Sequence, residues 1–267
     1  MTGASRGIGR AVAIELAARG FDVTATMRRP SDGSPFEHDT TGRIRVARLD
    51  VTKPETIELP RGLRVLVNNA ALEGAHLPLE GSSTAKWREV FETNVFGPAE
   101  VTRQAIPLMR DAGGGVICNI TTSAVLIPIP LYSAYRASKA AVSALGESLR
   151  IELAPMGIRV IEIIPGPIDT EMFHASGPAP EAFASEHYKS LADFIADQVR
   201  QATPYITSPV EAARAIVDAI LDDGGPLRYG CDPLGADMVS AWRKSSDTEQ
   251  LDAMSAGYAA FVQSSAT

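Results

Sequence analysis

The sequence predicts an α/β fold, built as one domain around a parallel sheet. Three observations support this prediction. Segments rich in apolar and β-branched residues alternate with longer helical segments, as in strand–helix–strand units. Polar residues gather directly after several of the strands, at the edge where open α/β sheets bind ligands. The length of 267 residues, 45% of them hydrophobic, suits one large core.

The expected elements follow one another as an alternation of strands and helices. Strands are predicted at 21–27, 44–49, 63–67, 116–120 and 158–164, with a short final strand at 227–229. Helices are predicted at 10–19, 83–101, 133–153, 185–201 and 209–221, and as one or two amphipathic helices from residue 237 on. Pro98 is expected to kink or divide the second of these helices.

Composition argues against several classes of protein. The net charge of −7 and the lack of a basic run argue against a nucleic-acid partner. The apolar runs are too short to span a membrane, and no secretory leader pattern opens the chain. Cys118 and Cys231 lie far apart and show no metal-ligand spacing, so we expect neither a metal site nor a disulfide framework. We therefore expect a cytoplasmic protein.

A glycine-rich turn at the start of the chain enters the first predicted helix. A turn of this kind presents backbone N–H groups and the positive end of the helix dipole, which suits a pyrophosphate. Glycine also allows the ligand to approach the backbone closely. The alternative is an ordinary glycine-rich turn. The predicted cofactor loop comprises Gly3, Ser5, Arg6, Gly7, Ile8 and Gly9.

The end of the 21–27 strand indicates which nicotinamide cofactor is used. In dinucleotide folds an acid at this place binds the ribose 2′-hydroxyl, whereas an arginine suits a 2′-phosphate. The chain has Arg28 there and no acid. We therefore predict that Arg28 and Arg6 flank a phosphate and that NADP(H) is preferred over NAD(H). Two solvated surface arginines are the alternative.

Tyr135 and Lys139 are four residues apart in the predicted 133–153 helix, so they lie on one face. An ammonium beside a phenol lowers the phenol's pKa from its reference value of about 10. Such a pair could exchange a proton with a carbonyl or alcohol near neutral pH. Asn94 lies in the middle of another helix, where asparagine is disfavoured, which indicates a specific role.

At this point the residues resemble the classical short-chain dehydrogenase/reductase family, over residues 1 to about 230. The resemblance implies a Rossmann-type doubly wound sheet and hydride transfer between a nicotinamide and a carbonyl or alcohol. The matching motifs are Thr2-Gly3-x-x-x-Gly7-Ile8-Gly9, Asp50-Val51-Thr52, Asn68-Asn69-Ala70, Asn94, Tyr135-x-x-x-Lys139, and Pro165-Gly166 with Thr170.

The resemblance also implies roles for single residues. Tyr135 would be the general acid/base, and Lys139 would bind the nicotinamide ribose and lower the pKa of Tyr135. Asn94 would support a proton-relay water. Asp50 would meet the adenine, Asn69 and Ala70 the adenosine ribose region, and Ile168 and Thr170 the nicotinamide carboxamide. Further cofactor contacts would come from Val51, Tyr135, Pro165 and Gly166.

The chain departs from the family pattern at its start. Family members carry a hydrophobic strand before the Thr-Gly pair, whereas Met1 directly precedes Thr2 here. That strand would be central in the sheet, so the chain lacks the usual first strand. Without it, we expect unpaired edges on the two neighbouring strands. We also expect that a longer natural protein exists.

Other departures concern single positions. The family's catalytic serine lies thirteen residues before the tyrosine, where this chain has Thr122. A threonine hydroxyl can donate the same hydrogen bond, so we expect Thr122 to act, with Ser123 as the alternative. Ala71 replaces a usual glycine. The seven-residue spacing of Tyr132 and Lys139 also resembles the divergent enoyl-reductase branch, although the glycine motif differs.

The stretch 171–208, here called the lid, is expected to cover the nicotinamide. Its Met172, Phe173, Phe183, Tyr188, Leu191 and Phe194 would face Pro128, Ile129 and Leu131 across an apolar pocket for a hydrophobic ketone or alcohol. The 226–230 segment and the helical tail at 237–267 resemble the hydroxysteroid and retinol dehydrogenase-like branch. The family resemblance implies a homodimer or homotetramer. The rival function is a non-catalytic NADP(H)-binding sensor or scaffold.

Overall fold

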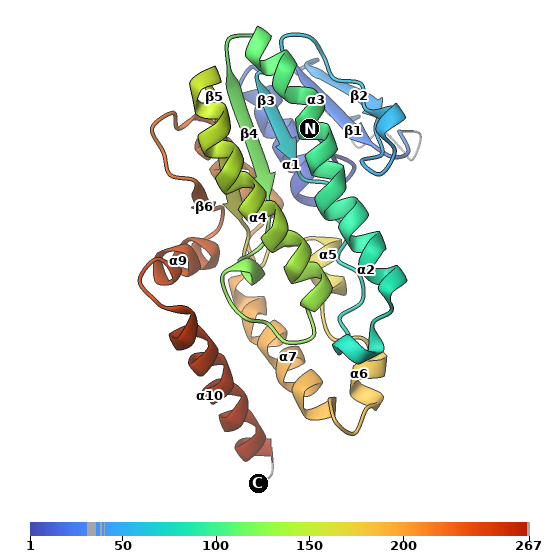
Figure 1. Ribbon diagram of the computed structural model, residues 1–267, viewed down its shortest axis with the longest axis vertical. Coiled ribbons are helices and arrows are strands. Elements are labelled where there is room, and N and C mark those ends of the chain that lie inside the picture. Colours follow the sequence, from blue (N-terminus) through green and yellow to red (C-terminus); the bar gives the residue numbers. More distant parts are fainter. Residues whose placement is uncertain (31–35, 38, 40, 266–267) are drawn as a thin grey trace.

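Six parallel strands form the centre of the computed structural model, which describes residues 1–30, 36, 37, 39 and 41–265 (Figure 1). Strands β1 (Val23–Met27) and β2 (Ile44–Arg48) form one sheet. The second sheet has the order β3 (Val65–Asn68), β4 (Gly115–Ile120), β5 (Ile158–Ile164) and β6 (Arg228–Gly230). The predicted α/β class with a parallel sheet is confirmed.

The two sheets meet at β1 and β3, which do not pair with each other. As the sequence analysis expects, no strand of the described residues lies between them. Met1 and Thr2 bridge part of this boundary through their backbone. The Met1 amino group donates to Thr24 O over 3.0 Å, Thr26 N donates to Met1 O, and Thr2 N donates to Val67 O over 3.0 Å. The glycine turn is thereby fixed between the carboxyl ends of β1 and β3.

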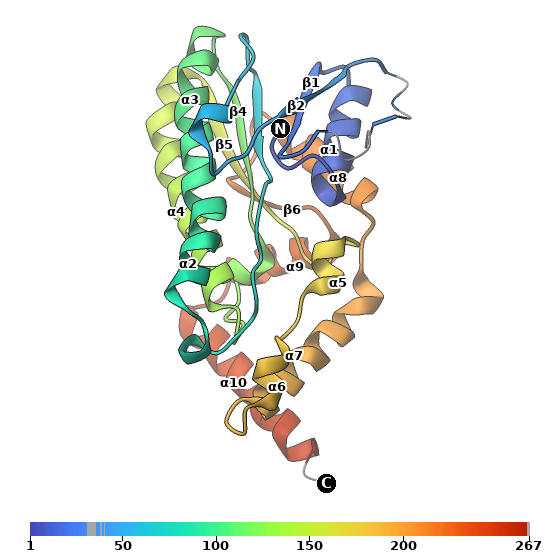
Figure 2. The ribbon, with the colours of Figure 1, turned by 90° about the vertical axis from the view of Figure 1, so that its right-hand side faces the viewer.

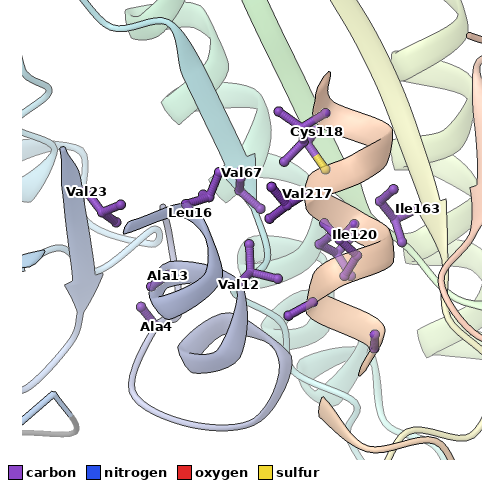
Figure 3. Close-up of a cluster of buried hydrophobic side chains, with 14 of the residues drawn as sticks. Ala4, Val12, Ala13, Leu16, Val23, Val67, Cys118, Ile120, Ile163 and Val217 are labelled. Atoms are coloured by element: carbon purple, nitrogen blue, oxygen red, sulfur yellow. The ribbon is translucent and has the colours of Figure 1, made fainter. Parts of the chain in front are cut away.

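Helices cover both faces of the strands (Figure 2). α1 (Gly7–Ala18) and α8 (Pro209–Leu221) lie on one side, and α3 (Gly97–Asp111) and α4 (Ser133–Leu153) lie on the other. Figure 3 shows Val12 and Leu16 of α1 between Val23 and Val67, and Val217 of α8 on the other side of Val67, near Cys118 and Ile120. They belong to one buried cluster that includes residues of both sheets, such as Val23 and Val67. The two sheets therefore share one core and form a single domain.

The helix predicted at 83–101 is divided in a way that the sequence did not indicate. α2 (Thr84–Phe91) passes into a π-helical turn at Glu92–Phe96, and α3 follows from Gly97. Pro98 lies in the first turn of α3, where its missing N–H is tolerated. The division therefore comes from the π turn ahead of Pro98. Asn94 lies in this turn.

The lid and the tail are helical and extend beyond the carboxyl ends of the strands, toward the bottom of Figure 1. The lid contains α5 (Glu171–Ala175), α6 (Pro180–Ala184) and α7 (Lys189–Ala202) where one helix was predicted at 185–201. The tail contains α9 (Pro233–Trp242) and α10 (Asp247–Ser265). None of the helices in the described ranges is long and apolar enough to cross a bilayer. Short 3₁₀ turns occur at Pro54–Thr56, Leu79–Gly81, Ser123–Val125, Ala154–Met156 and Thr203–Tyr205.

Candidate active site

The predicted site residues converge on one cavity of about 650 Å³ at the carboxyl ends of the strands. This volume lies in the range of small-molecule and cofactor sites. Asn94 is the exception, because it is buried and does not line the cavity. The cavity is lined by Gly3, Ser5, Arg6, Gly7, Ile8, Gly9, Arg28, Asp50, Val51, Asn69, Ala70, Thr122, Tyr135, Lys139, Pro165, Gly166, Ile168 and Thr170.

The glycine turn requires glycine for two physical reasons. Gly3 and Gly7 have φ values of 65° and 53°, in the left-handed region that side chains disfavour. At Gly9 the reason is space, because a Cβ there would lie 2.3 Å from Gly3 O and 2.5 Å from Asn69 Nδ2. The turn therefore brings backbone against the cavity at the N-terminus of α1, an arrangement that suits phosphate.

Asn69 and Thr2 hold this turn against the end of β3. Asn69 Nδ2 donates to Thr2 O over 3.1 Å and to Gly3 O over 2.9 Å. Thr2 Oγ1 accepts from the N–H groups of Asn69 and Ala70. The sequence analysis placed Asn69 near the adenosine ribose. In the structure its side-chain amide is bonded to the glycine turn.

The two arginines predicted to read a 2′-phosphate differ in their partners. Arg6 forms an exposed ion pair with Glu171 at the start of the lid. Arg28 lines the cavity near Asp50, and its charge contributes to the pKa of that carboxyl. Although partial burial opposes ionisation of Asp50, hydrogen bonds from the side chain and N–H of Thr52 hold its pKa below the ordinary value.

Tyr135 lies in the cavity wall in a buried position. Burial raises the pKa of its phenol, the negative charge of Glu73 raises it further, and a hydrogen bond with Thr122 acts in the opposite direction. The net shift is therefore upward, against the expectation that Lys139 would lower it. The physical reason is that burial disfavours the phenolate more than its surroundings stabilise it.

Lys139 is buried behind Tyr135, with Nζ 5.9 Å from the centre of the Tyr135 ring. Nζ donates a hydrogen bond of 2.9 Å to Ile120 O, at the end of β4. Burial lowers the pKa of Lys139 to about 8, although the charges of Glu162 and Glu73 oppose this shift. The ammonium therefore loses its proton in a mildly alkaline range.

Thr122, rather than Ser123, hydrogen-bonds Tyr135. Thr122 Oγ1 also accepts from Ala124 N, which caps the short turn at Ser123–Val125. Ser123 lines the cavity, and its N–H donates to Pro165 O. Tyr132, the alternative tyrosine, points its hydroxyl to Ser176 of the lid, at 3.0 Å.

Asn94 joins three segments of the chain, one of them α4. Its Nδ2 donates to Leu72 O over 2.7 Å and to Ser138 Oγ over 2.9 Å, and its Oδ1 accepts from Leu72 N. Ser138 lies between Tyr135 and Lys139 in α4. Asn94 thus connects the π turn to the loop after β3 and to the helix that carries the tyrosine and the lysine.

The segment after β5 is fixed at both ends. Gly166 N donates to Asp232 Oδ1 over 2.7 Å, and Asp232 also caps α9. Thr170 Oγ1 accepts from Phe173 N and so begins α5 of the lid. Sequence reasoning missed Asp232. The pattern that could have indicated it is an acidic residue directly before Pro233, which is typical of a helix N-cap.

The apolar wall of the cavity differs from the predicted one. Met172, Phe173 and Ile129 line it as predicted. Phe183, Tyr188, Leu191 and Phe194 are not part of the lining and instead pack into a cluster with Leu131 and the tail. Of these four, Phe194 contacts Tyr258 and Phe261 of the tail through its ring. Other apolar residues line the cavity in their place: Ile195, Val199, Leu234, Met238 and Met254.

Sequence comparison places the chain in a known family. A family profile described as short chain dehydrogenase matches residues 1–181. The chain is 33% identical over 213 residues to the uncharacterized oxidoreductase YusZ of Bacillus subtilis. The matched region covers 73% of this chain and 75% of that protein. It is 34% identical over 256 residues to human 11-beta-hydroxysteroid dehydrogenase type 2, covering 86% and 62%.

Solved structures give the same result. A short-chain dehydrogenase from Streptomyces avermitilis matches with a TM-score of 0.74 and 32% identity, over 98% of this chain and 94% of that one. One from Burkholderia cenocepacia, in complex with NADP, matches with a TM-score of 0.72 and 26% identity, over 95% and 94%. The chain belongs to the short-chain dehydrogenase/reductase family, whose oxidoreductases act on alcohol or carbonyl groups with a nicotinamide cofactor.

Proposed function

We propose that this protein is an NADP(H)-dependent oxidoreductase that transfers hydride between the nicotinamide and the carbonyl or alcohol of a small, hydrophobic substrate. The observation that carries the proposal is the position of Tyr135. Its phenol lies in the cavity wall, bonded to Thr122 and in front of Lys139. A proton donor and a second hydroxyl thus meet at one point of an otherwise largely apolar cavity.

The residues present fit a dinucleotide. The left-handed φ values of Gly3 and Gly7 and the close packing of Gly9 against Gly3 O and Asn69 shape a turn that lines the cavity at the N-terminus of α1, where a phosphate would bind. Ile168 and Thr170 line the cavity near Pro165 and are proposed to hold the nicotinamide end. When bound, the nicotinamide supplies or accepts the hydride.

We assign the proton transfer to Tyr135. Because burial keeps its pKa high, the phenol is protonated at neutral pH and can donate to a carbonyl oxygen as that oxygen becomes an alcohol. Thr122 Oγ1 would donate a second hydrogen bond to the same oxygen. Lys139 would bind the ribose and neutralise the phenolate that remains. Asn94 would hold Leu72 and Ser138 in place, and with them a proton-relay water.

The preference for NADP(H) is proposed from Arg6 and Arg28. Both line the cavity beside the glycine turn, and β1 is followed directly by Arg28 and Arg29 and by no acid. The Burkholderia cenocepacia relative was solved in complex with NADP, which supports the same choice.

The test is a titration with NADPH and with NADH, followed by turnover of carbonyl substrates. We expect tighter binding of NADPH, and Arg28→Ala should weaken NADPH more than NADH, by about 10-fold, because a charge-assisted contact is lost. Tyr135→Phe should keep cofactor affinity and lose most of the turnover, by about 100-fold or more. Full turnover in Tyr135→Phe would refute the mechanism. NADPH binding without any turnover would favour the sensor or scaffold.

We further propose that the protein forms a homodimer or homotetramer in the cytoplasm. Phe96 and Ile151 are large apolar side chains with 58% and 78% exposure, on the helices of one outer face. A subunit interface would cover them. Cys118 and Cys231 are both free and buried, which fits a reducing compartment. Light scattering coupled to size-exclusion chromatography gives the assembly directly.

A further inference from the structure

Four side chains beside Tyr135 form a polar network that the proposed reaction does not use. Glu73 and His76 come from the loop after β3, Tyr132 directly precedes α4, and Ser176 belongs to the lid. We call these four residues the Glu73 cluster. Glu73, Tyr132 and Ser176 line the cavity, and His76 is buried behind them.

Two hydrogen bonds fix the Glu73 carboxylate, and both involve the same oxygen. His76 Nε2 lies 2.9 Å from Glu73 Oε1, and Ser176 Oγ donates to Oε1 over 2.7 Å. The Tyr132 hydroxyl lies 3.0 Å from Ser176 Oγ, and the His76 ring stacks on the Tyr132 ring with centroids 3.5 Å apart. The carboxylate is therefore held in one orientation.

The other oxygen, Oε2, has no hydrogen-bond or ion-pair partner within the part of the chain that the structure describes. The side chain is 14% exposed and lines the cavity that contains Tyr135. An ionised carboxylate accepts hydrogen bonds at both oxygens. Oε2 is therefore available to accept one from a molecule in the cavity.

Glu73 is close to the reacting groups. Burial is the largest cause of the raised pKa of Tyr135, and the negative charge of Glu73 is the second. The same charge opposes the lowering of the pKa of Lys139. His76, which is bonded to Glu73, places its ring edge-on to the Tyr135 ring with centroids 6.4 Å apart. A group bound to Oε2 would thus lie near the atom that receives the proton.

A purely apolar substrate would fit this arrangement poorly. It would displace water from Oε2 and leave a charged oxygen without a partner, which is costly. We propose that Glu73 selects substrates that carry a hydrogen-bond donor, a hydroxyl or an ammonium group, next to the carbon that reacts. This inference rests on the proposed function, because it assumes that a carbonyl or alcohol is the reacting group.

The test compares three ketones that differ only in the group on the carbon next to the carbonyl: 2-hydroxy-1-phenylethanone, 2-amino-1-phenylethanone and propiophenone, which has a methyl group at that place. The ratio of kcat/KM for each donor ketone to that for propiophenone is measured in the wild type, Glu73→Gln and Glu80→Gln. Glu80 is an exposed carboxylate outside the cavity lining and serves as the matched control. Binding of the same ketones to the enzyme–NADP⁺ complex is measured by calorimetry.

We expect the wild type and Glu80→Gln to prefer a donor ketone by about 10-fold or more, and Glu73→Gln to lose most of this preference. A larger loss for the amine identifies an ammonium substrate, a larger loss for the hydroxy ketone identifies a hydroxyl, and an equal loss shows that Glu73 accepts from either donor. If Glu73 had a merely structural role, Glu73→Gln would change kcat/KM for all three ketones alike and leave the ratios intact, which would refute the inference. A wild type that shows no preference for the donor ketones would refute it as well.

Calorimetry separates this inference from the proposed function. If no ketone is turned over but the donor ketones bind more tightly, and Glu73→Gln removes that difference, the assignment of Glu73 stands and the proposed reaction fails. If the protein binds NADP⁺ but shows no selective binding of the donor ketones, the assignment of Glu73 is refuted.

Discussion

Burial determines the charge of the two residues that the proposed mechanism needs most. It raises the pKa of the Tyr135 phenol and lowers that of Lys139 to about 8, because each side chain loses solvation of its charged form. The unliganded site therefore favours a neutral tyrosine. The opposing charges of Glu162 and Glu73 keep Lys139 protonated at neutral pH.

The shift of Lys139 predicts how stability depends on pH. Its folded pKa, about 8, lies below the ordinary lysine pKa of 10.5, which applies to the unfolded chain. Between these values the unfolded chain binds the proton and the folded protein does not, so the free energy of unfolding rises with pH in this window. In Lys139→Met this rise is absent. From about pH 7.5 to 9.5, the free energy of unfolding in urea should rise by about 2 kcal/mol more in the wild type than in Lys139→Met.

Lys86→Met is the control for this experiment, because Lys86 is exposed on α2. It should follow the wild type across the same pH range. Buried groups such as Cys118 and Tyr135 also titrate abnormally, but they are common to all three proteins and cancel in the comparison. Parallel pH curves for Lys139→Met and the wild type would contradict the assignment.

At the scale of elements, the π turn between α2 and α3 gives Asn94 its position. A π turn inserts one residue into a helix and is often found at functional sites. Here it buries Asn94. The side-chain amide of Asn94 accepts from the N–H of Leu72 and donates to its carbonyl, two bonds that a strand or helix would otherwise supply. The turn therefore connects Leu72, which lines the cavity, to Ser138 of α4.

Asn94→Ala should destabilise the protein because it leaves the Leu72 N–H and carbonyl without their partners. We expect a loss of about 2–3 kcal/mol in the free energy of unfolding, from the cost of unpaired polar groups. Gln104→Ala in α3 removes a side-chain amide that donates to Glu100 and should cost less than about 1 kcal/mol. Equal losses in the two variants, measured by urea unfolding, would argue against this role of Asn94.

The sequence predicted some elements to the residue and others poorly. The bounds of α4, β5 and α8 agree with the prediction, because helix formers, β-branched runs and the cap at Ser208 with Pro209 are local signals. The π turn carries no such signal. The position of Phe194 was missed because the side of α7 that faces the cavity depends on where the distant tail packs.

The same distinction holds for the candidate site. Motif residues at strand ends converge because parallel strands share one edge, and this was predictable. The Glu73 cluster was not, because it joins residues 73, 76, 132 and 176 through tertiary contacts. The available signal was two polar residues, Glu73 and His76, shortly after a buried strand.

At the scale of the whole molecule, the lid and the tail close the lower side of the cavity together. α10 packs on α7, and Met254 of α10 reaches the cavity lining. Phe261 and Tyr258 of α10 contact Phe194 of α7 with ring centroids 5.5 and 5.4 Å apart. Ile195 and Val199 of the same helix line the cavity. The tail therefore supports the part of the cavity wall that α7 forms.

Phe261→Ala tests whether this support affects function. Loss of the aromatic contact, worth about 1 kcal/mol, should loosen α7 against the tail. We expect the KM for a carbonyl substrate to rise several-fold, on the order of 3–10, while NADPH affinity stays within about 2-fold, because the glycine turn lies at the other end of the cavity. Leu251→Ala removes a side chain of the same helix that is 54% exposed and should leave both values unchanged. An equal loss of NADPH affinity in Phe261→Ala would show instead that the tail stabilises the fold as a whole.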